Sequence, residues 1–199
     1  MKKRIGIMGG TFNPIHNGHV QMAIQTYQQF QLDEVLVMPS GDPPHKRSQV
    51  VLDAGKRSDM VKLAIKGHPG LVFSDLEITR SGYSYTAETL QELKDLYEEI
   101  YFIIGADSLF SIEKWYHPEI IMKLCTLVVA NRDRHPDAEF EKFIHYLTDK
   151  YQADIRILHV PDMPVSSSQI RENVVNGQSI SDLVSPAVAA YIEANSLYK

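Results

Sequence analysis

"RIGIMGGTFNPIHNGHVQMAIQTYQQF", residues 4–30, joins an apolar strand pattern to a helix pattern through a loop rich in glycine. The apolar run at 4–9 predicts a short buried strand, and the apolar spacing within 16–30 predicts a helix. The loop at 9–19 contains three glycines, one proline and two histidines. A change of direction needs roughly one glycine with left-handed backbone geometry. The composition of the loop therefore predicts that a ligand lies against its backbone.

The same alternation of strand and helix patterns continues along the rest of the chain. Short strands separated by helices predict a parallel sheet with helices on both faces, because parallel neighbours need a crossover. The expected fold is a doubly wound, Rossmann-like α/β domain with a C-terminal helical end, and one domain spans 1–199. A polar loop with paired prolines at 39–55 is long enough to suggest function. Strands are expected at 33–40, 71–79, 100–107, 126–132 and 153–160, and helices at 56–67, 84–99, 112–125, 138–151, 167–177 and 185–198.

The composition excludes several classes of protein. The 199 residues carry a formal charge of -5 with a sequence pI near 5.9, which disfavours a broad nucleic-acid surface and favours a small anionic ligand. The sequence shows neither a signal-peptide core nor an apolar run of about 18 residues, so we expect a cytoplasmic protein without membrane contact. The single cysteine, Cys125, lies in an apolar stretch and is expected to be a buried structural thiol. The composition leaves the oligomeric state open, a homo-oligomer included.

The loop at 9–19 matches neither the P-loop nor the dinucleotide glycine fingerprint. His16 and His19 are three residues apart, so in the first turn of a helix they would share one face. Three interpretations are open: a zinc site, capping or surface histidines, and donors to phosphate oxygens. The zinc site lacks a third ligand nearby. We favour phosphate recognition, with the two imidazoles stabilising charge on a phosphoryl group during transfer.

The pattern G-x-F-x-P-x-H-x-G-H at 10–19 resembles the nucleotidyltransferase superfamily that shares the H-x-G-H motif. That resemblance implies transfer of a nucleotidyl group from ATP or CTP with release of pyrophosphate. It implies that His16 and His19 stabilise the transition state. Asn13 stands where the superfamily usually has aspartate. The loop residues that the resemblance places against the triphosphate are Gly9, Gly10, Thr11, Phe12 and Gly18.

A second signature lies near the C-terminus, in "VSSSQIRENV" at 165–174. Serines are ordinary N-caps, but an arginine in the first helical turn opposes the helix dipole unless an anion is bound. The stretch is similar to the superfamily's second motif, and by that resemblance Ser167, Ser168 and Arg171 hold the β- and γ-phosphates of ATP. In "IIGADS" at 103–108, the resemblance places Gly105 and Asp107 beside the ribose and base. A helix cap is the equal alternative for Asp107.

Three further segments concern the acceptor. Trp115 and Tyr116 lie in "KWYHPE", Thr86 follows Tyr85 at a predicted helix start, and Lys46 ends "PPHK". Together they resemble the bacterial nicotinate mononucleotide adenylyltransferase branch over nearly the whole chain. The resemblance implies that Trp115 stacks on the pyridine ring, although a lone tryptophan is often core filler. It implies further that Thr86 and the Tyr116 backbone bind the carboxylate. In the same resemblance Lys46 binds the mononucleotide phosphate and Arg132 approaches the phosphates. His45 either shapes the loop or contacts the ligand.

The implied reaction is adenylyl transfer from ATP to nicotinate mononucleotide, a step of NAD biosynthesis. Its products are nicotinic acid adenine dinucleotide and pyrophosphate. The expected partners are these two small molecules, with Mg²⁺ held mainly by the ATP phosphates and no metal ligands from the protein. The alternatives are a superfamily transferase for nicotinamide mononucleotide, phosphopantetheine or glycerol phosphate, and a nucleotide-binding regulator without catalysis.

Overall fold

The computed structural model describes residues 2–42, 51–131, 138–161 and 163–199. Its six-stranded sheet has the order β3-β2-β1-β4-β5-β6, and every neighbouring pair is parallel. This confirms the expected doubly wound, Rossmann-like fold. The strands are β1 (Arg4–Gly10), β2 (Glu34–Pro39), β3 (Leu71–Phe73), β4 (Glu99–Gly105), β5 (Thr126–Asn131) and β6 (Ile155–His159).

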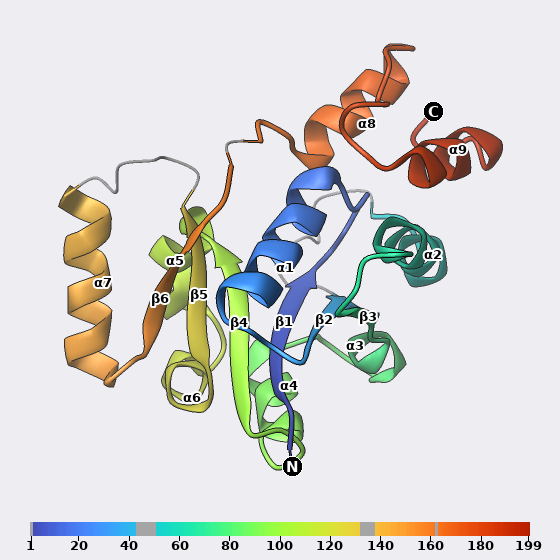
Figure 1. The fold of residues 1–199 in the computed structure, drawn as a ribbon. Helices are drawn as coiled ribbons and strands as arrows, with labels where there is room; N and C mark the ends of the chain where they lie inside the picture. The colour runs from blue at the N-terminus through green and yellow to red at the C-terminus, as the bar shows by residue number, and fades with distance from the viewer. Residues whose placement is uncertain (1, 43–50, 132–137, 162) are drawn as a thin grey trace.

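Helices cover both faces of this sheet (Figure 1). One side carries α1 (Asn17–Gln29) and α2 (Ala54–Ile65), and the C-terminal helices α8 (Ser167–Val175) and α9 (Pro186–Ala194) contribute to the same core. The other side carries α4 (Thr86–Leu93), α5 (Ala106–Ser111), the 3-10 turn η2 (Ile112–Lys114), α6 (Pro118–Leu124) and α7 (Ala138–Tyr151). The short helix α3 (Leu76–Thr79) follows β3.

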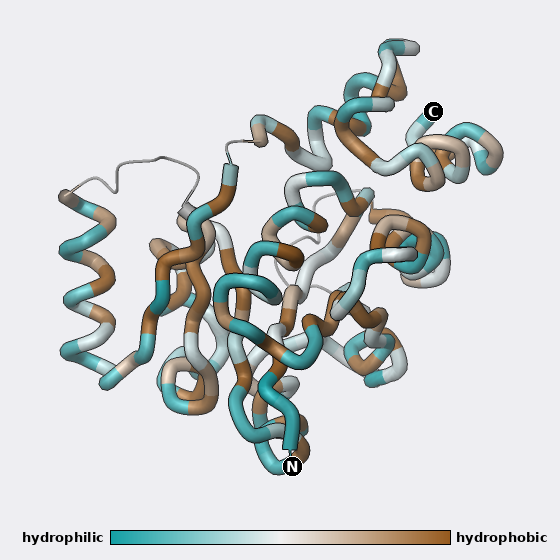
Figure 2. The backbone as a smooth tube through the Cα atoms, in the orientation of Figure 1, coloured by the Kyte–Doolittle hydropathy of each residue, from teal (hydrophilic) through white to brown (hydrophobic). Residues whose placement is uncertain are grey.

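Two hydrophobic cores form because successive strand residues point to opposite faces of the sheet. Ile5 and Ile7 of β1 belong to the core under α4 to α7, whereas Met8 belongs to the core under α1 and α2. In each neighbouring strand, too, successive residues belong to opposite cores, and Figure 2 shows hydrophobic stretches along the central strands. Burial on both faces explains why the apolar runs predicted a parallel sheet.

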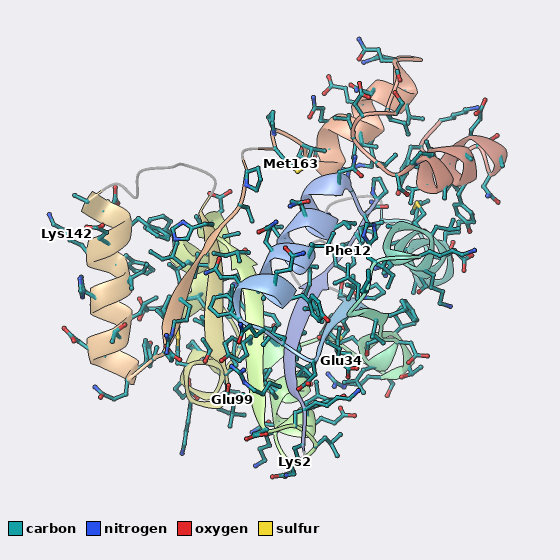
Figure 3. The ribbon with its side chains drawn as sticks, in the orientation of Figure 1. Lys2, Phe12, Glu34, Glu99, Lys142 and Met163 are labelled. Carbon is teal, nitrogen blue, oxygen red and sulfur yellow. The ribbon has the colours of Figure 1, made fainter. Side chains whose placement is uncertain are left out.

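The functional end of the sheet follows from the strand order. The chain leaves β1 toward β2 on one side and β4 toward β5 on the other, so a crevice opens at the carboxyl ends of β1 and β4. Figure 1 shows α8 and α9 beyond that end of the sheet, and Figure 3 shows Met163 there and Lys2 at the opposite end. The loop at 9–19 emerges at this crevice.

Three predicted elements were wrong in part. Residues 71–79 do not form one strand, because β3 ends at Phe73 and 76–79 form α3. The helix predicted for 84–99 ends at Leu93, and Glu99 already belongs to β4. The helix predicted for 112–125 is interrupted: His117 has a left-handed φ of 50°, and Pro118 begins α6, where its missing N–H costs nothing.

Cys125 is 8% exposed, and burial raises the pKa of its thiol, which confirms the expected buried thiol. In the part of the chain that the structure describes, no helix is both long and apolar enough to cross a membrane.

Candidate active site

The two histidines form a reciprocal cap at the start of α1. His16 is the N-cap residue, and its Nδ1 accepts the backbone N–H of His19 at 3.3 Å. His19 Nδ1 in turn accepts the backbone N–H of His16 at 3.3 Å. The rings are stacked with centroids 3.6 Å apart, and Phe12 meets His19 edge-on at 5.1 Å. The structure confirms that His16 and His19 form a pair. Because they also cap α1, the capping interpretation applies to them as well.

This cap fixes the chemistry of the imidazoles. An Nδ1 that accepts an N–H is unprotonated, so the proton of a neutral ring lies on Nε2. The arrangement thus provides Nε2–H donors held in place by backbone hydrogen bonds, which is suited to stabilising a charged oxygen rather than to abstracting a proton.

The backbone carbonyls of the loop are held by side chains from distant segments. Arg57 Nη1 donates to the Thr11 carbonyl at 2.7 Å, and Arg171 Nη1 donates to the Asn13 carbonyl at 2.8 Å. The Ser167 hydroxyl donates to the Pro14 carbonyl at 2.8 Å. These bonds bring the predicted C-terminal signature against the predicted triphosphate loop, more than 150 positions away in sequence.

The N-terminus of α8 adds detail to the second signature. Ser166 is the N-cap, since its hydroxyl accepts the backbone N–H of Gln169 at 3.2 Å. Arg171 Nη2 donates to the Ser168 hydroxyl at 3.2 Å, in addition to its bond to the loop. Ser168 and Arg171 therefore lie together beside the loop, and the roles predicted for them and for Ser167 in phosphate binding stay predictions.

A pocket of about 300 Å³ opens beside the start of the loop. It brings Gly9, Gly10 and Thr11 together with the predicted acceptor residues Thr86, Trp115 and Tyr116. Thr86 is the first residue of α4, and the N–H groups of Thr86 and Ala87 precede the first backbone bond of this helix, from Glu88 to the Tyr85 carbonyl. The remaining lining residues are Ser40, Glu77, Ser84, Tyr85, Phe102, Ser108 and Ile121.

Aromatic rings shape this pocket. Trp115 meets Phe102 edge-on with centroids 6.4 Å apart, and the rings of Tyr85 and Tyr116 lie 4.4 Å apart. Tyr116 is 46% exposed, so it lies at the mouth of the pocket, whereas Phe102 is 6% exposed. The pocket can therefore accept a flat ring. The histidine pair, Gly18, Gly105, Asp107 and the residues of α8 do not line it.

Two residues of the site were missed by sequence reasoning. Glu77 lines the pocket and is 8% exposed; the Thr89 hydroxyl donates to it at 2.8 Å, and burial raises the pKa of its carboxyl. It was missed because 71–79 read as one strand. Arg57 is 1% exposed, and burial lowers the pKa of its guanidinium. Nothing in the residues around Arg57 in the sequence distinguishes it from a surface arginine.

Gly105 is the N-cap of α5, and Asp107 lies in the first turn of that helix. The capping alternative for Asp107 is therefore wrong. A Cβ on Gly105 would meet no heavy atom within 4 Å, so the predicted ribose position borders open space. Lys46, Arg132 and His45 lie outside the described residues. Among the residues that the structure does describe, no three His, Cys, Asp or Glu side chains cluster as metal ligands would.

The chain is similar to a known protein family and to full-length relatives. The model of the cytidylyltransferase-like family matches residues 7–173. The chain is 43% identical to a Lachnoclostridium phytofermentans protein, over 98% of this chain and 99% of the relative. It is 44% identical to a Synechococcus protein, over 99% of this chain and 95% of the relative. Both relatives bear the name "Probable nicotinate-nucleotide adenylyltransferase".

The fold has a counterpart among solved structures. The Plasmodium falciparum nicotinic acid mononucleotide adenylyltransferase in complex with NaAD superposes with a TM-score of 0.79 at 21% identity. The superposition covers 98% of this chain and 97% of the other.

Proposed function

The chain belongs to the cytidylyltransferase-like family, and from its similarity to the two full-length relatives we propose that it transfers the adenylyl group of ATP to nicotinate mononucleotide. The products are nicotinic acid adenine dinucleotide and pyrophosphate. The observation that carries the proposal is the 300 Å³ pocket, which places aromatic rings and the start of α4 beside the loop at 9–19. The acceptor would bind in the pocket, and the triphosphate would bind along the loop. The whole chain acts as one domain in this proposal.

The acceptor nucleotide supplies the nucleophile. Its 5′-phosphate is largely dianionic at neutral pH, because the second pKa of a phosphate monoester is about 6. One phosphate oxygen attacks the α-phosphorus in line, the new P–O bond forms, and the bond to pyrophosphate breaks. The attack needs no strong general base, so catalysis consists of positioning and charge stabilisation.

The chain's own residues fit these two tasks. The Nε2–H groups of His16 and His19 would donate to the oxygens of the moving phosphoryl group. Arg171, with Ser167 and Ser168, would hold the departing phosphates, since a guanidinium has five N–H donors and two of its nitrogens already bond to protein. Gly105 and Asp107 would border the ribose and base.

Selectivity for the acid would come from the start of α4. The leading N–H groups of a helix favour a carboxylate, and Thr86 places them in the pocket. Trp115 would stack on the pyridine ring. Lys46 and Arg132 stay proposals for the mononucleotide phosphate and the triphosphate.

We propose that Mg²⁺ enters with ATP. Mg²⁺ is commonly bound through substrate phosphates and water rather than by a cage of protein ligands. When bound it neutralises charge on the triphosphate.

The test is turnover with purified protein, ATP and Mg²⁺ on a panel of acceptors: nicotinate mononucleotide, nicotinamide mononucleotide, phosphopantetheine and glycerol phosphate. We expect pyrophosphate and the deamido dinucleotide with the first acceptor at the highest kcat/KM. H16A and H19A should lose about 10² to 10³ in kcat, the cost of removing one oxyanion donor, and remain folded. H145A, on the exposed side of α7, is the matched control. Preference for another acceptor, or ATP binding without pyrophosphate release, would replace the proposed function.

A further inference from the structure

Asn13 joins three segments of the chain at the centre of the loop. Its side-chain oxygen accepts the Tyr198 hydroxyl at 3.0 Å and the backbone N–H of Leu52 at 3.3 Å. Its backbone carbonyl accepts Arg171 Nη1 at 2.8 Å. Asn13 is 5% exposed, so these contacts are shielded from water.

The direction of the Tyr198 bond is determined by its neighbours. A backbone N–H can only donate, so the atom of Asn13 facing Leu52 is the oxygen. The phenol facing the same oxygen must then be the donor. Burial raises the pKa of the Tyr198 phenol, and the opposing effect of Arg171 and Arg57 is smaller. The hydroxyl therefore remains protonated at neutral pH and keeps donating.

Tyr198 is itself fixed in place. It packs against the core under α1 and α2, and the preceding Leu197 is 3% exposed within that core. The same C-terminal region holds the far end of the loop, because the Leu183 carbonyl accepts the backbone N–H of Asn17 at 2.9 Å. His16 lies between Asn13 and Asn17. Both ends of the short segment that carries it are thus bonded to the C-terminal region.

We propose that Tyr198 is a positioning residue, which acts through Asn13 to hold Arg171 and the histidine pair in one fixed arrangement. The bond requires an acceptor oxygen at position 13, which an asparagine amide supplies without a charge. The catalytic consequence rests on the proposed function, whereas the effect on the loop does not.

The experiment compares Y198F with Y191F. Each removes one hydroxyl from the C-terminal region, but the Tyr191 hydroxyl donates to Asp59 of α2 at 2.8 Å, away from the loop. Amide hydrogen exchange of residues 11–19 is measured on the protein without substrates. Loss of one such hydrogen bond should accelerate this exchange by about 2- to 12-fold in Y198F. Exchange at 11–19 should be unchanged in Y191F.

Turnover provides the second readout. In Y198F, kcat should fall by up to about the same factor, with the KM for nicotinate mononucleotide nearly unchanged, because Tyr198 does not line the acceptor pocket. In a background of N13A, which removes the same bond from its other end, Y198F should add no further effect on exchange or kcat.

The outcomes separate the two proposals. Exchange in Y198F that equals wild type, or effects of Y198F and N13A that simply add, would overturn the role of Tyr198. Faster exchange in Y198F together with a wild-type protein that forms no dinucleotide would leave the positioning role intact and reject the proposed function.

Discussion

Replacing Arg57 by methionine should destabilise the protein and loosen the active-site loop together. Arg57 Nε donates to the Leu52 carbonyl at 2.9 Å, Nη1 to Thr11 at 2.7 Å, and Nη2 to Ser40 at 2.7 Å. Methionine keeps much of the aliphatic volume and removes all of these donors. Nη2 also donates to the Gly41 carbonyl at 3.2 Å. Four carbonyls, two of them in residues that line the pocket, would therefore lose this partner.

The expected change in the free energy of unfolding is the difference between two opposing contributions. Hydrogen bonds from a charged donor contribute about 1.5–3 kcal/mol each, so the three shortest of these bonds contribute about 5–9 kcal/mol before compensation. In the wild type the guanidinium of Arg57 is buried, because the residue is only 1% exposed. The variant avoids this desolvation penalty, which offsets the loss of stability by several kcal/mol. We expect a net loss of about 2–4 kcal/mol. For a chain of this size that corresponds to a Tm lower by about 4–16 °C.

The assay is urea unfolding at 25 °C, with turnover measured well below the transition. R57K should not restore stability, because a compact ammonium cannot reach carbonyls of separate loops as the planar guanidinium does. R156M is the matched control on an exposed arginine and should cost no more than about 0.5 kcal/mol. A loss below about 1 kcal/mol in R57M, with normal turnover, would refute the idea that Arg57 supports the loop.

The other predictions concern the pocket and the nucleotide. Because burial raises the folded-state pKa of Glu77, its stabilising effect is present at low pH and is lost as pH rises through that raised value. E77Q keeps an acceptor for Thr89 and stays neutral at every pH. Its free energy of unfolding, measured with urea, should therefore rise relative to that of the wild type as pH rises from about 4.5. A difference in stability that shrinks with rising pH would contradict this. G105A should fold normally, since its Cβ meets no atom within 4 Å at a φ of -81°, but should raise the KM for ATP; an unchanged KM would mean that the ribose lies elsewhere. W115A should weaken the use of nicotinate mononucleotide by about 5- to 150-fold, from the value of ring stacking, with W115F partly restoring it; an equal change in the KM for ATP would indicate a structural tryptophan.

Much of the fold could be predicted because the central strands contain buried apolar runs. The apolar runs at β1, β4 and β5 fit few structures other than a buried strand. The helices between them could be predicted from the spacing of their apolar residues. Prediction failed where a pattern fitted two structures. The apolar residues Leu76 and Ile78 alternate as in a strand, but β3 is an edge strand that pairs with β2 over three residues, and the chain turns into α3.

The site was predicted in the same uneven way. His16, His19 and Arg171 carry distinctive spacing, and the structure brings them to one loop. Glu77 and Arg57 have no local signature, because what makes each unusual is burial beside groups far along the chain. Burial and hydrogen-bond partners are properties of the packed molecule, so a single glutamate or arginine in a helix pattern cannot reveal them.

The amino-acid sequence by itself determined the sheet, the loop that follows β1 and the chemistry of its histidines, since apolar periodicity and short-range spacing act locally. The tertiary structure alone decided which distant groups complete that loop. Arg57, Arg171 and Tyr198 reach Thr11 and Asn13 across 46 to 185 positions of sequence. Their partners are backbone carbonyls and an amide oxygen, which every sequence contains in abundance, and only the packing of α2, α8 and the C-terminal region selects which of them are bonded.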